Sequence, residues 1–370
     1  MLTSTLLFVF LFQLFAAVRT APVPFDFGGH LNNIFGGEDD NSSTNDEDSS
    51  GFFDGLLDKA EDAVSEDASD LLKGILGDDD SASSNTTTST VSVSSTDLTA
   101  AFSRPAFFSR IAYCSSASVE SFSCGAPCDA LEAESVDILA TGGDGGTIPK
   151  FVIAHDKSTN SIVVAHQGTD PENILSILND ADLVLTPIDT ESFPSAAGKG
   201  IEVHSGFLET FSRTASTILS TVKSALSSTG ADSVVLTGHS LGSALAMLDA
   251  LMFNDALANV SIQTTTFGSP RVGNQAFADF ADTSLSSGVF ARMTNKADPV
   301  PHLPPIVLDF VHPQGEVHLG DAGAVLCERQ ENKSEACADG EGLLAITDGV
   351  GDHLGPYFDG ISFGLGECSA

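Results

Sequence analysis

The chain has 370 residues and a formal net charge of −36 at pH 7, with 51 acidic residues against 15 lysines and arginines. A chain this acidic, with no basic cluster, is not expected to bind nucleic acid or to dock by charge on anionic membranes. Its hydrophobic content of 42% is ample for a buried core, and its length fits one large domain with extra segments.

The N-terminus carries an apolar segment, residues 6–18, that closes on small residues and is too short to span a bilayer comfortably. It indicates a signal peptide over residues 1–21 and secretion without a stable membrane anchor; a buried strand is the competing interpretation. Six cysteines, an even number, suit an oxidising compartment. The glycosylation candidates are the sequons at Asn41, Asn85, Asn259 and Asn332.

Residues 22–95 form an acidic, Ser/Thr-rich segment whose two ends we expect to be disordered. Within it, residues 52–76 repeat apolar side chains at three- and four-residue steps, which predicts an amphipathic helix. We interpret 22–95 as a propeptide or N-terminal extension, and 96–370 as the main domain. Either the helix covers an apolar active-site mouth until removal, or the segment is a solubilising tail.

The main domain is predicted to open with a helix that carries apolar residues from Leu98 to Tyr113. Thr96 and Asp97 are both plausible N-caps, and Pro105 marks a kink or the true start. Further on, Cys124-Gly-Ala-Pro-Cys128 forms a tight loop. A small disulfide is favoured there over a metal pair, because no His or second Cys pair lies at zinc spacing.

The next segments indicate strands and helices in alternation. Residues 150–154 and 161–166 flank a polar turn and predict a hairpin. Residues 208–226 predict a long helix that Gly230 ends, and strands are expected at 234–236, 261–267 and 289–294. The order strand, helix, strand predicts an α/β fold with parallel crossovers.

Between the hairpin and the long helix lies a short amphipathic segment bracketed by Asp170-Pro171 and Pro187. Its apolar residues are either part of the core or the face of a mobile lid, and periodicity alone does not separate the two. The candidate lid residues are Ile174, Leu175, Ile177, Leu178 and Leu183.

The pentapeptide Gly238-His-Ser-Leu-Gly242 stands between an apolar strand pattern and a helical pattern of small residues. A G-x-S-x-G sequence in that context is typical of a nucleophile elbow, in which the glycines leave room for a strained turn at Ser240. The Leu241 N–H then lies at a helix start, free to bind a developing oxyanion.

A serine nucleophile needs a histidine base that is oriented by a carboxylate, and in this fold they follow the serine in the order acid, histidine. Asp298, at the end of a predicted strand, is the preferred acid, and Asp309 is its best rival. Weaker competitors are Asp249, Asp279 and Asp282.

For the base, His353 lies on a glycine-rich loop near the C-terminus. His302, His312 and His318 also follow Asp298, but His302 is interpreted as a packing or hydrogen-bonding residue and the other two as strand-end residues. His239 is expected to point away from Ser240. No histidines pair at metal spacing, so we expect neither a metal nor a cofactor.

Together with Gly238–Gly242, two further motifs carry a resemblance to a known family: Asn295-Lys-Ala-Asp-Pro-Val-Pro-His-Leu-Pro-Pro305 and Asp352-His-Leu-Gly-Pro-Tyr-Phe358. Over residues 97–370 the chain resembles the fungal class 3 lipases, secreted α/β-hydrolases that act on triacylglycerols and have feruloyl esterases as relatives. The resemblance implies a mostly parallel sheet flanked by helices, with a short lid helix over the active site.

The resemblance also assigns roles to residues. It implies a triad of Ser240, Asp298 and His353, oxyanion donors at Thr169 and Leu241, a lid over 174–183, and a propeptide. The implied disulfides are Cys114–Cys368, Cys124–Cys128 and Cys327–Cys337. One departure is Gln167, where the family usually has an arginine, which puts the partner of the open lid in doubt.

The expected function is therefore hydrolysis of acylglycerol esters at a lipid–water interface by a secreted, monomeric serine esterase that forms an acyl-enzyme. The apolar lid segment favours lipid over a soluble aryl ester, so feruloyl or other soluble-ester hydrolysis is the alternative. A third reading, from a different class, is an inactive hydrolase relative that only binds lipid.

Overall fold

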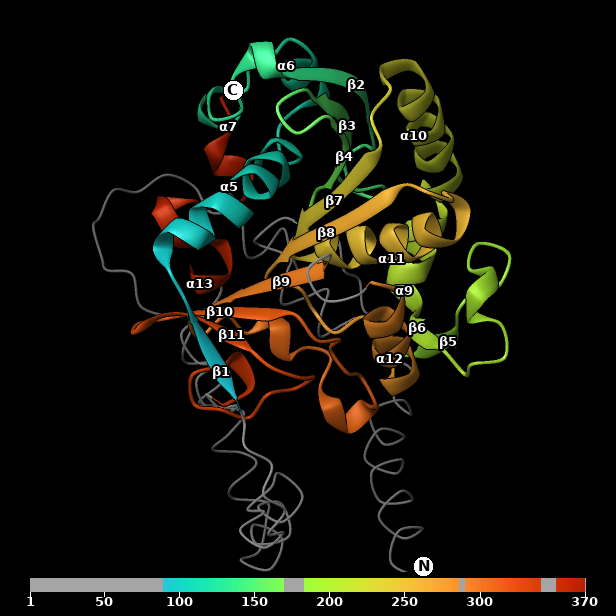
Figure 1. Ribbon diagram of the computed structural model, residues 1–370, viewed down its shortest axis with the longest axis vertical. Coiled ribbons are helices and arrows are strands. Elements are labelled where there is room, and N and C mark those ends of the chain that lie inside the picture. The colour runs from blue at the N-terminus through green and yellow to red at the C-terminus, as the bar shows by residue number, and fades with distance from the viewer. Residues whose placement is uncertain (1–88, 170–182, 286–289, 341–350, 370) are drawn as a thin grey trace, which may run out of the picture. The chain divides into compact units, whose positions relative to one another are not determined.

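The structure is a computed structural model that describes residues 89–169, 183–285, 290–340 and 351–369 (Figure 1). The chain divides into two compact units, Met1–Asp80 and Ser81–Ala370, and all described residues lie in the second. The predicted signal peptide and the amphipathic segment 52–76 lie outside the described residues. So do four of the lid candidates, Ile174, Leu175, Ile177 and Leu178.

A nine-stranded sheet in the order β1-β11-β10-β9-β8-β7-β4-β3-β2 forms the centre of the described domain. Neighbouring strands are parallel from β4 through β7, β8 and β9 to β10, and antiparallel pairs complete both ends. The strands are β1 Thr90–Val93, β2 Val136–Gly142, β3 Phe151–Asp156, β4 Ser161–His166, β7 Ser233–His239, β8 Ser261–Phe267, β9 Phe290–Asn295, β10 Glu316–Gly320 and β11 Gly323–Cys327. The mostly parallel sheet confirms the predicted α/β class.

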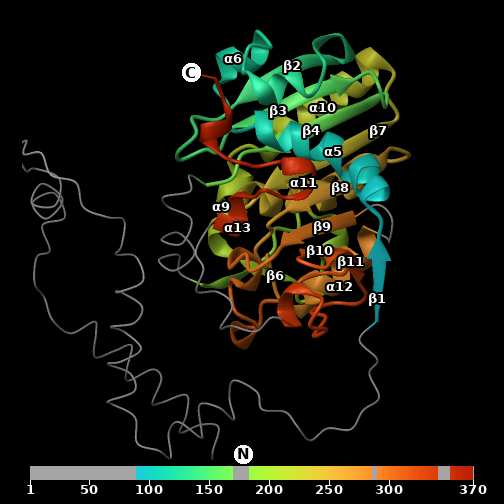
Figure 2. The same ribbon diagram turned by 90° about the vertical axis from the view of Figure 1, so that its left-hand side faces the viewer.

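Helices cover both faces of this sheet, with α5 on one side of β7 and α11 on the other (Figures 1 and 2). The α-helices are α5 Ser95–Ile111, α6 Ser116–Glu120, α7 Ala126–Asp129, α9 Ser205–Ser212, α10 Ala215–Thr229, α11 Leu241–Ala256, α12 Gln275–Ser284 and α13 Gly351–Leu354. A separate two-stranded ladder joins β5 Leu185–Pro187 to β6 Glu202–His204.

The side chains of β4 alternate between two cores. Ile162 and Val164 pack with α9, α10 and α11, whereas Val163 and Ala165 pack with Phe108 and its neighbours on α5. This follows from the period of two in a strand, which sends successive side chains to opposite faces. Because both faces are covered, β4 is buried along its whole length and its four central residues, 162–165, form a continuous apolar run.

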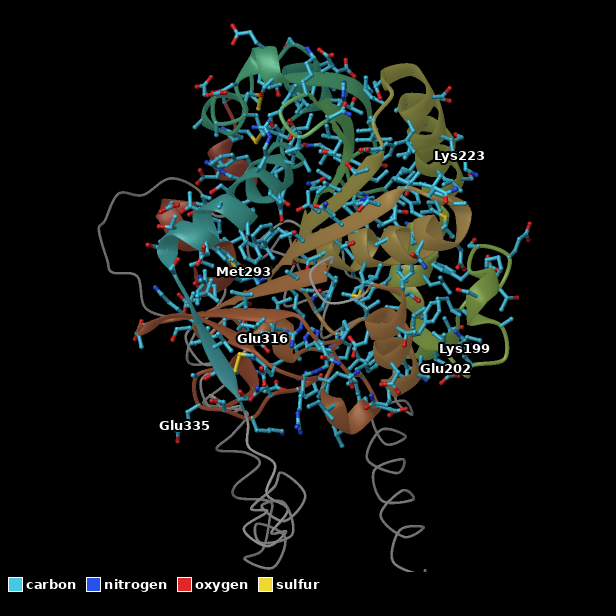
Figure 3. All side chains as sticks on the ribbon, viewed as in Figure 1. Lys199, Glu202, Lys223, Met293, Glu316 and Glu335 are labelled. Atoms are coloured by element: carbon cyan, nitrogen blue, oxygen red, sulfur yellow. A yellow bond between two sulfur atoms is a disulfide. The ribbon has the colours of Figure 1, made fainter. Side chains whose placement is uncertain are left out.

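Charged residues divide between the surface and the interior of the domain (Figure 3). Lys223 of α10 and Glu335 are exposed, as expected for a solvated charge. Glu316 of β10 is instead buried beside β9, where its carboxylate accepts a hydrogen bond from Arg292 at 2.9 Å. A buried charge of this kind requires such a partner.

The folded domain begins earlier than the sequence predicts. β1 pairs with β11 along its whole length, so residues 90–93, which their Ser/Thr-rich composition places in the acidic extension, belong to the sheet. The helix cap is likewise earlier: Ser94 Oγ, not Thr96 or Asp97, accepts the hydrogen bond from the Asp97 N–H at 3.2 Å. Pro105 lies inside α5 and does not begin it.

The single long helix predicted over 208–226 is two helices, α9 and α10. The chain tightens at Arg213 and Thr214, whose N–H groups bond to Thr210 and Phe211 three residues back, and Thr214 leaves the helical conformation. Apolar side chains on both sides of this break, Phe211 and Ala215, are buried in one core. The apolar period therefore continues across the break and hides it. The prediction that Gly230 ends the second helix is confirmed, because it takes a left-handed conformation (φ 76°) as the C-cap.

Candidate active site

Ser240 lies on the sharp turn between β7 and α11, with φ 58° and ψ −129°. A Cβ on Gly238 would lie 2.2 Å from the Gly242 carbonyl oxygen, and one on Gly242 would lie 2.3 Å from the His166 carbonyl oxygen. Only glycine fits at either position, which explains the G-x-S-x-G spacing. The strained, positive φ of a serine here is the feature expected of a nucleophile elbow.

Asp298 follows β9 and is completely enclosed, with its carboxylate against the imidazole of His353. Both carboxylate oxygens lie 2.9 Å from His353 Nδ1, and Oδ1 also accepts a hydrogen bond from the Val300 N–H at 2.9 Å. Of the rivals, Asp309 is exposed and caps a single 3-10 turn, and Asp249 pairs with His166 at 2.8 Å. The structure thus brings together the sequence-predicted acid and base.

The other ring nitrogen of His353, Nε2, is buried and has no hydrogen-bond partner among the described residues. The ring lies against the end of β8: a Cβ on Gly268 would be 2.9 Å from it. The preceding residue, Phe267, accepts a hydrogen bond from the Ser240 N–H at 2.9 Å. The elbow and the imidazole therefore both border the Phe267–Gly268 backbone. The Nε2 atom of this imidazole is an acceptor without a described partner.

The backbone around His353 is held by two side chains from distant parts of the chain, His239 and Asn295, and by the nearby Tyr357. His239 Nε2 donates to the His353 carbonyl oxygen at 2.8 Å, and Tyr357 Oη donates to the same oxygen at 3.2 Å. Asn295 Nδ2 donates to the carbonyl of Asp352 at 2.8 Å. The sequence predicts a loop at His353, but the structure places it on the short helix α13, and these contacts fix α13 relative to the elbow.

His239 itself is fixed from both sides. Its Nε2 donates, so its Nδ1 is the acceptor for the Tyr113 hydroxyl at 2.6 Å, and its ring stacks on Phe363 at 4.5 Å. Burial holds the pKa of His239 well below its ordinary value, so the ring is neutral. The prediction for His239 gave only its direction, away from Ser240. The chain's two tyrosines, Tyr113 and Tyr357, both lie here, and their rarity is the one signal in the sequence that could have drawn attention to them.

The predicted oxyanion donors border the same elbow. Leu241 is the first residue of α11, so its N–H has no partner within the helix. A Cβ on Gly168 would lie 2.9 Å from Ser240 Cβ and 2.5 Å from the His239 carbonyl oxygen. Gly168 is therefore in close contact with the elbow, and Thr169 is the next residue in the chain. Beside it, Gln167 is buried and its Oε1 accepts a hydrogen bond from the Lys150 N–H at 2.9 Å.

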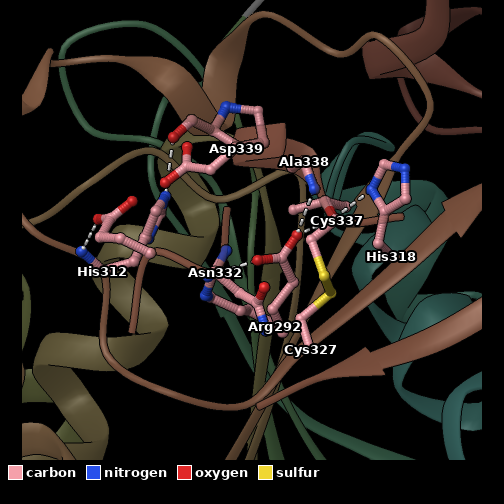
Figure 4. Close-up of polar contacts among 12 residues, drawn as sticks. Arg292, His312, His318, Cys327, Asn332, Cys337, Ala338 and Asp339 are labelled. Carbon is pink, nitrogen blue, oxygen red and sulfur yellow. Dashed lines mark hydrogen bonds and ion pairs between the residues drawn. A yellow bond between two sulfur atoms is a disulfide. The ribbon is translucent and has the colours of Figure 1, made fainter. Parts of the chain in front are cut away.

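A buried network of charged side chains supports the loop that follows Asp298, and Figure 4 shows the part of this network around Arg292, His312 and Asp339. Arg271 Nη1 donates to the carbonyls of His302 at 2.6 Å and Pro304 at 3.2 Å, and its guanidinium pairs with Glu331 and Asp339. Burial and the neighbouring Glu331 raise the pKa of Asp339 to about 7. His302 therefore belongs to a supporting network, in agreement with its interpretation as a packing or hydrogen-bonding residue.

The three disulfides implied by the resemblance are present: Cys114–Cys368, Cys124–Cys128 and Cys327–Cys337. The first ties the end of α5 to the C-terminal segment that carries Phe363, and so supports the residues around His239. The second is the small loop disulfide favoured over a metal pair.

The described sequons differ in accessibility. Asn259 is exposed, with φ 65°, in the turn after α11. Asn332 is only 4% exposed, and its Nδ2 donates to the carbonyls of Ser89 at 3.1 Å and Glu328 at 2.8 Å. Because Nδ2 is the atom that a glycan would occupy, the folded structure does not fit glycosylation at Asn332. Asn41 and Asn85 lie outside the described residues.

Comparison with known proteins agrees with this arrangement. The family model for lipase (class 3) matches residues 163–308. A secreted mono- and diacylglycerol lipase, LIP2 of Malassezia restricta, is 32% identical over 225 residues, which cover 60% of this chain and 69% of the relative. The chain belongs to the class 3 lipase family.

Solved structures extend the similarity of this class 3 lipase to its fold. The Rhizomucor miehei lipase propeptide complex has a TM-score of 0.63 at 27% identity, covering 75% of this chain and 84% of that one. A triacylglycerol lipase whose catalytic centre is formed by a serine protease triad has a TM-score of 0.62 at 27% identity, covering 75% and 99%. These matches confirm the α/β-hydrolase fold.

Like its relatives, this class 3 lipase is a carboxylic ester hydrolase and is secreted. None of its described helices is long and apolar enough to cross a membrane.

Proposed function

We propose that Ser240 is the nucleophile, His353 the general base and Asp298 the acid that orients it. One observation carries this proposal: His353 is bound to Asp298 through Nδ1 while its buried Nε2 remains without a described partner beside the elbow. An imidazole bound this way has its proton on Nδ1 and a free lone pair on Nε2, which is the form that accepts a proton from a serine hydroxyl.

The reaction then runs in two halves. His353 Nε2 takes the Ser240 proton as the oxygen attacks the ester carbonyl, and Asp298 stabilises the imidazolium that forms. The imidazolium returns the proton to the leaving alcohol, which leaves an acyl-enzyme on Ser240. Water, activated by His353 in the same way, hydrolyses this ester and releases the fatty acid.

Thr169 and the Leu241 N–H are proposed to bind the oxyanion of both tetrahedral intermediates. The free N–H at the start of α11 and the close approach of Gly168 to Ser240 support this assignment. Loss of one such donor costs about 10²–10³-fold in rate.

For the substrate we propose acylglycerols at a lipid–water interface, hydrolysed by a monomer. Support comes from the mono- and diacylglycerol lipase relative, from the triacylglycerol lipase among the solved structures, and from the apolar residues of segment 174–183. Leu183, the described end of that segment, is half-buried. An aliphatic lid that moves aside would expose an apolar patch to lipid.

For the N-terminus, we propose that residues 1–21 are a signal peptide and that most of 22–95 is a propeptide. Because β1 pairs with β11, we place the end of the removable part before Thr90. The Rhizomucor miehei lipase propeptide complex supports such a segment in this family. Activity of the full chain and of a chain that begins at Ser89 would be compared: a gain on removal is expected, and equal activity would leave only a solubilising role.

The substrate class is tested by comparing emulsified triolein with dissolved methyl ferulate, for the wild type and for Ser240→Ala. We expect fatty acid release from triolein that rises above the substrate's solubility limit and is lost in the variant. Faster hydrolysis of methyl ferulate, with no rise at the solubility limit, would favour a soluble-ester esterase instead.

A further inference from the structure

A single 3-10 turn, Ile306–Leu308, presents three large apolar side chains to solvent in succession. Ile306 is 40% exposed, Val307 78% and Leu308 42%. Of the other exposed large hydrophobic residues in the described ranges, Val91 and Leu326 lie opposite each other on β1 and β11, and Leu139, Val184 and Leu365 are separate in the sequence. Three in a row, on a turn so short that all of them protrude, is a feature that core packing does not explain.

Hydrogen bonds hold the backbone of this turn. The Leu308 N–H bonds to the Pro305 carbonyl at 3.0 Å, and the Asp309 N–H bonds to the Ile306 carbonyl at 2.8 Å. Asp309 ends the turn in a left-handed conformation, and the next residue, Phe310, returns to the interior. On the other side, Arg271 holds the Pro304 carbonyl at 3.2 Å. The apolar side chains are therefore displayed by a fixed backbone.

The turn belongs to the loop that begins at Asp298. Val300 of this loop is buried, and it packs with Leu303 and with Leu354, which follows His353 on α13. These contacts join the loop that carries Ile306–Leu308 to the segment that carries the proposed base.

The size and charge of this turn's surface favour an uncharged lipid surface as its binding partner. Three side chains offer far less than the roughly 800 Å² per partner that a stable protein interface needs. No lysine or arginine lies between Leu303 and Pro313, Asp309 adds an exposed negative charge, and the whole chain carries −36. Anionic phospholipid would be repelled, whereas an acylglycerol droplet accepts apolar side chains without needing positive charge.

We propose that Ile306–Leu308, named here the apolar tip, inserts into the surface of an uncharged lipid droplet and docks the active site on its substrate. The proposal rests on the acylglycerol substrate proposed above and adds a second contact, distinct from the 174–183 segment. Because the apolar tip contains none of the proposed catalytic residues, a substitution in it should change droplet binding without changing the rate of ester hydrolysis.

The test measures droplet binding and ester hydrolysis separately in the full chain. Variants Val307→Ser and Ile306→Ser/Val307→Ser are compared with Leu139→Ser, a matched control because Leu139 is an exposed hydrophobic residue (39%) on the edge strand β2, outside this loop. Binding is measured by flotation with triolein droplets, all in a Ser240→Ala background so that the droplets stay intact. Hydrolysis is measured on dissolved p-nitrophenyl acetate with Ser240 restored.

We expect Val307→Ser to weaken droplet binding about 10-fold, and the double variant more, because each loses apolar surface that the lipid would bury. Leu139→Ser should bind as the parent does, all variants should hydrolyse the dissolved ester at the parent rate, and droplets coated with anionic phospholipid should bind less. Unchanged droplet binding in the double variant would overturn the proposal. So would an equal loss in Leu139→Ser, or a dimer in sedimentation that Val307→Ser dissociates. A parent that binds droplets through the apolar tip but releases no fatty acid from triolein would refute the proposed substrate and leave the apolar tip standing.

Discussion

The Nε2 atom of His239 donates a hydrogen bond to the backbone carbonyl of His353 at 2.8 Å, so the residue before the proposed nucleophile holds the proposed base. The two rings lie 4.4 Å apart. This contact spans 114 positions of sequence and joins the end of β7 to α13 directly. Any shift of one element would therefore be transmitted to the other.

Replacing His239 by phenylalanine keeps a flat ring against Phe363 but removes the donor to His353. We expect kcat for a soluble ester to fall about 10- to 100-fold with little change in KM, because the base would lose its position by a fraction of an ångström to one ångström. Tyr113→Phe, which removes only the hydroxyl that fixes the tautomer, should cost less. An unchanged kcat in His239→Phe, with thermal stability preserved, would show that the contact only packs the site.

Asp298→Asn should lower kcat by about 10⁴-fold, because an amide beside Nδ1 favours the wrong tautomer of His353 and cannot stabilise the imidazolium. Asp309→Asn is the matched control, since Asp309 was the best rival in the sequence and is exposed in the structure. Steady-state kinetics on a soluble ester check both variants. Near-normal activity in Asp298→Asn, or a large loss in Asp309→Asn, would reverse the assignment.

Because His204 is buried, we expect the free energy of unfolding to depend on pH. Burial lowers its pKa to about 4 from the ordinary 6.5, and its Nδ1 accepts a hydrogen bond from the Gly206 N–H that protonation would abolish. The unfolded chain takes up this proton first, so the contribution is complete above about pH 6.5 and is lost as the pH falls toward 4.

In that range, His204→Asn should reduce the slope of unfolding free energy against pH by up to about 1.4 kcal/mol per unit, because asparagine keeps an acceptor but does not titrate. Urea unfolding at several pH values measures the slope. His155→Asn, on a half-exposed position of β3, is the control. An identical slope in the wild type and in His204→Asn would contradict the prediction.

Glycosylation should distinguish Asn259 from Asn332. The protein would be secreted from a eukaryotic host, and site occupancy measured by peptide mass spectrometry before and after enzymatic deglycosylation. We expect the exposed Asn259 to have carried a glycan and Asn332 not, because the amide nitrogen of Asn332 makes two internal hydrogen bonds. Asn332→Gln should lower stability even without a glycan to lose. A highly occupied Asn332 in folded, active protein would mean that those bonds form differently.

The parts of the site that sequence could predict are those written in short, contiguous motifs. The strained turn at Ser240 needs glycines at fixed offsets, so strand, turn and helix could all be read from one stretch. The choice of Asp298 over Asp309 followed from its place at a strand end and from the family motif. Strand β4 can also be predicted from the sequence, because all of its residues are buried and its central residues are apolar.

Other features depend on contacts between distant segments, and local pattern carries no trace of them. Residues 90–93, Thr-Val-Ser-Val, form a four-residue edge strand that continues a Ser/Thr-rich stretch, so only their pairing with β11 separates them from the acidic extension. The break between α9 and α10 leaves the apolar period intact. The bonds from His239 at the end of β7 and from Asn295 at the end of β9 reach residues 352–353 of α13 across 114 and 57 positions of sequence. Such positioning contacts require the fold before they can be seen.

The central claim, that Ser240 is the nucleophile, is tested most directly by labelling with an alkyl phosphonate ester. Intact and peptide mass spectrometry would be applied to the wild type and to Ser240→Ala. We predict one phosphonyl group per chain, located on Ser240, with loss of esterase activity in proportion to labelling, and neither label nor activity in the folded variant. A label on another residue, or a Ser240→Ala variant that still hydrolyses esters at the wild-type rate, would contradict the account.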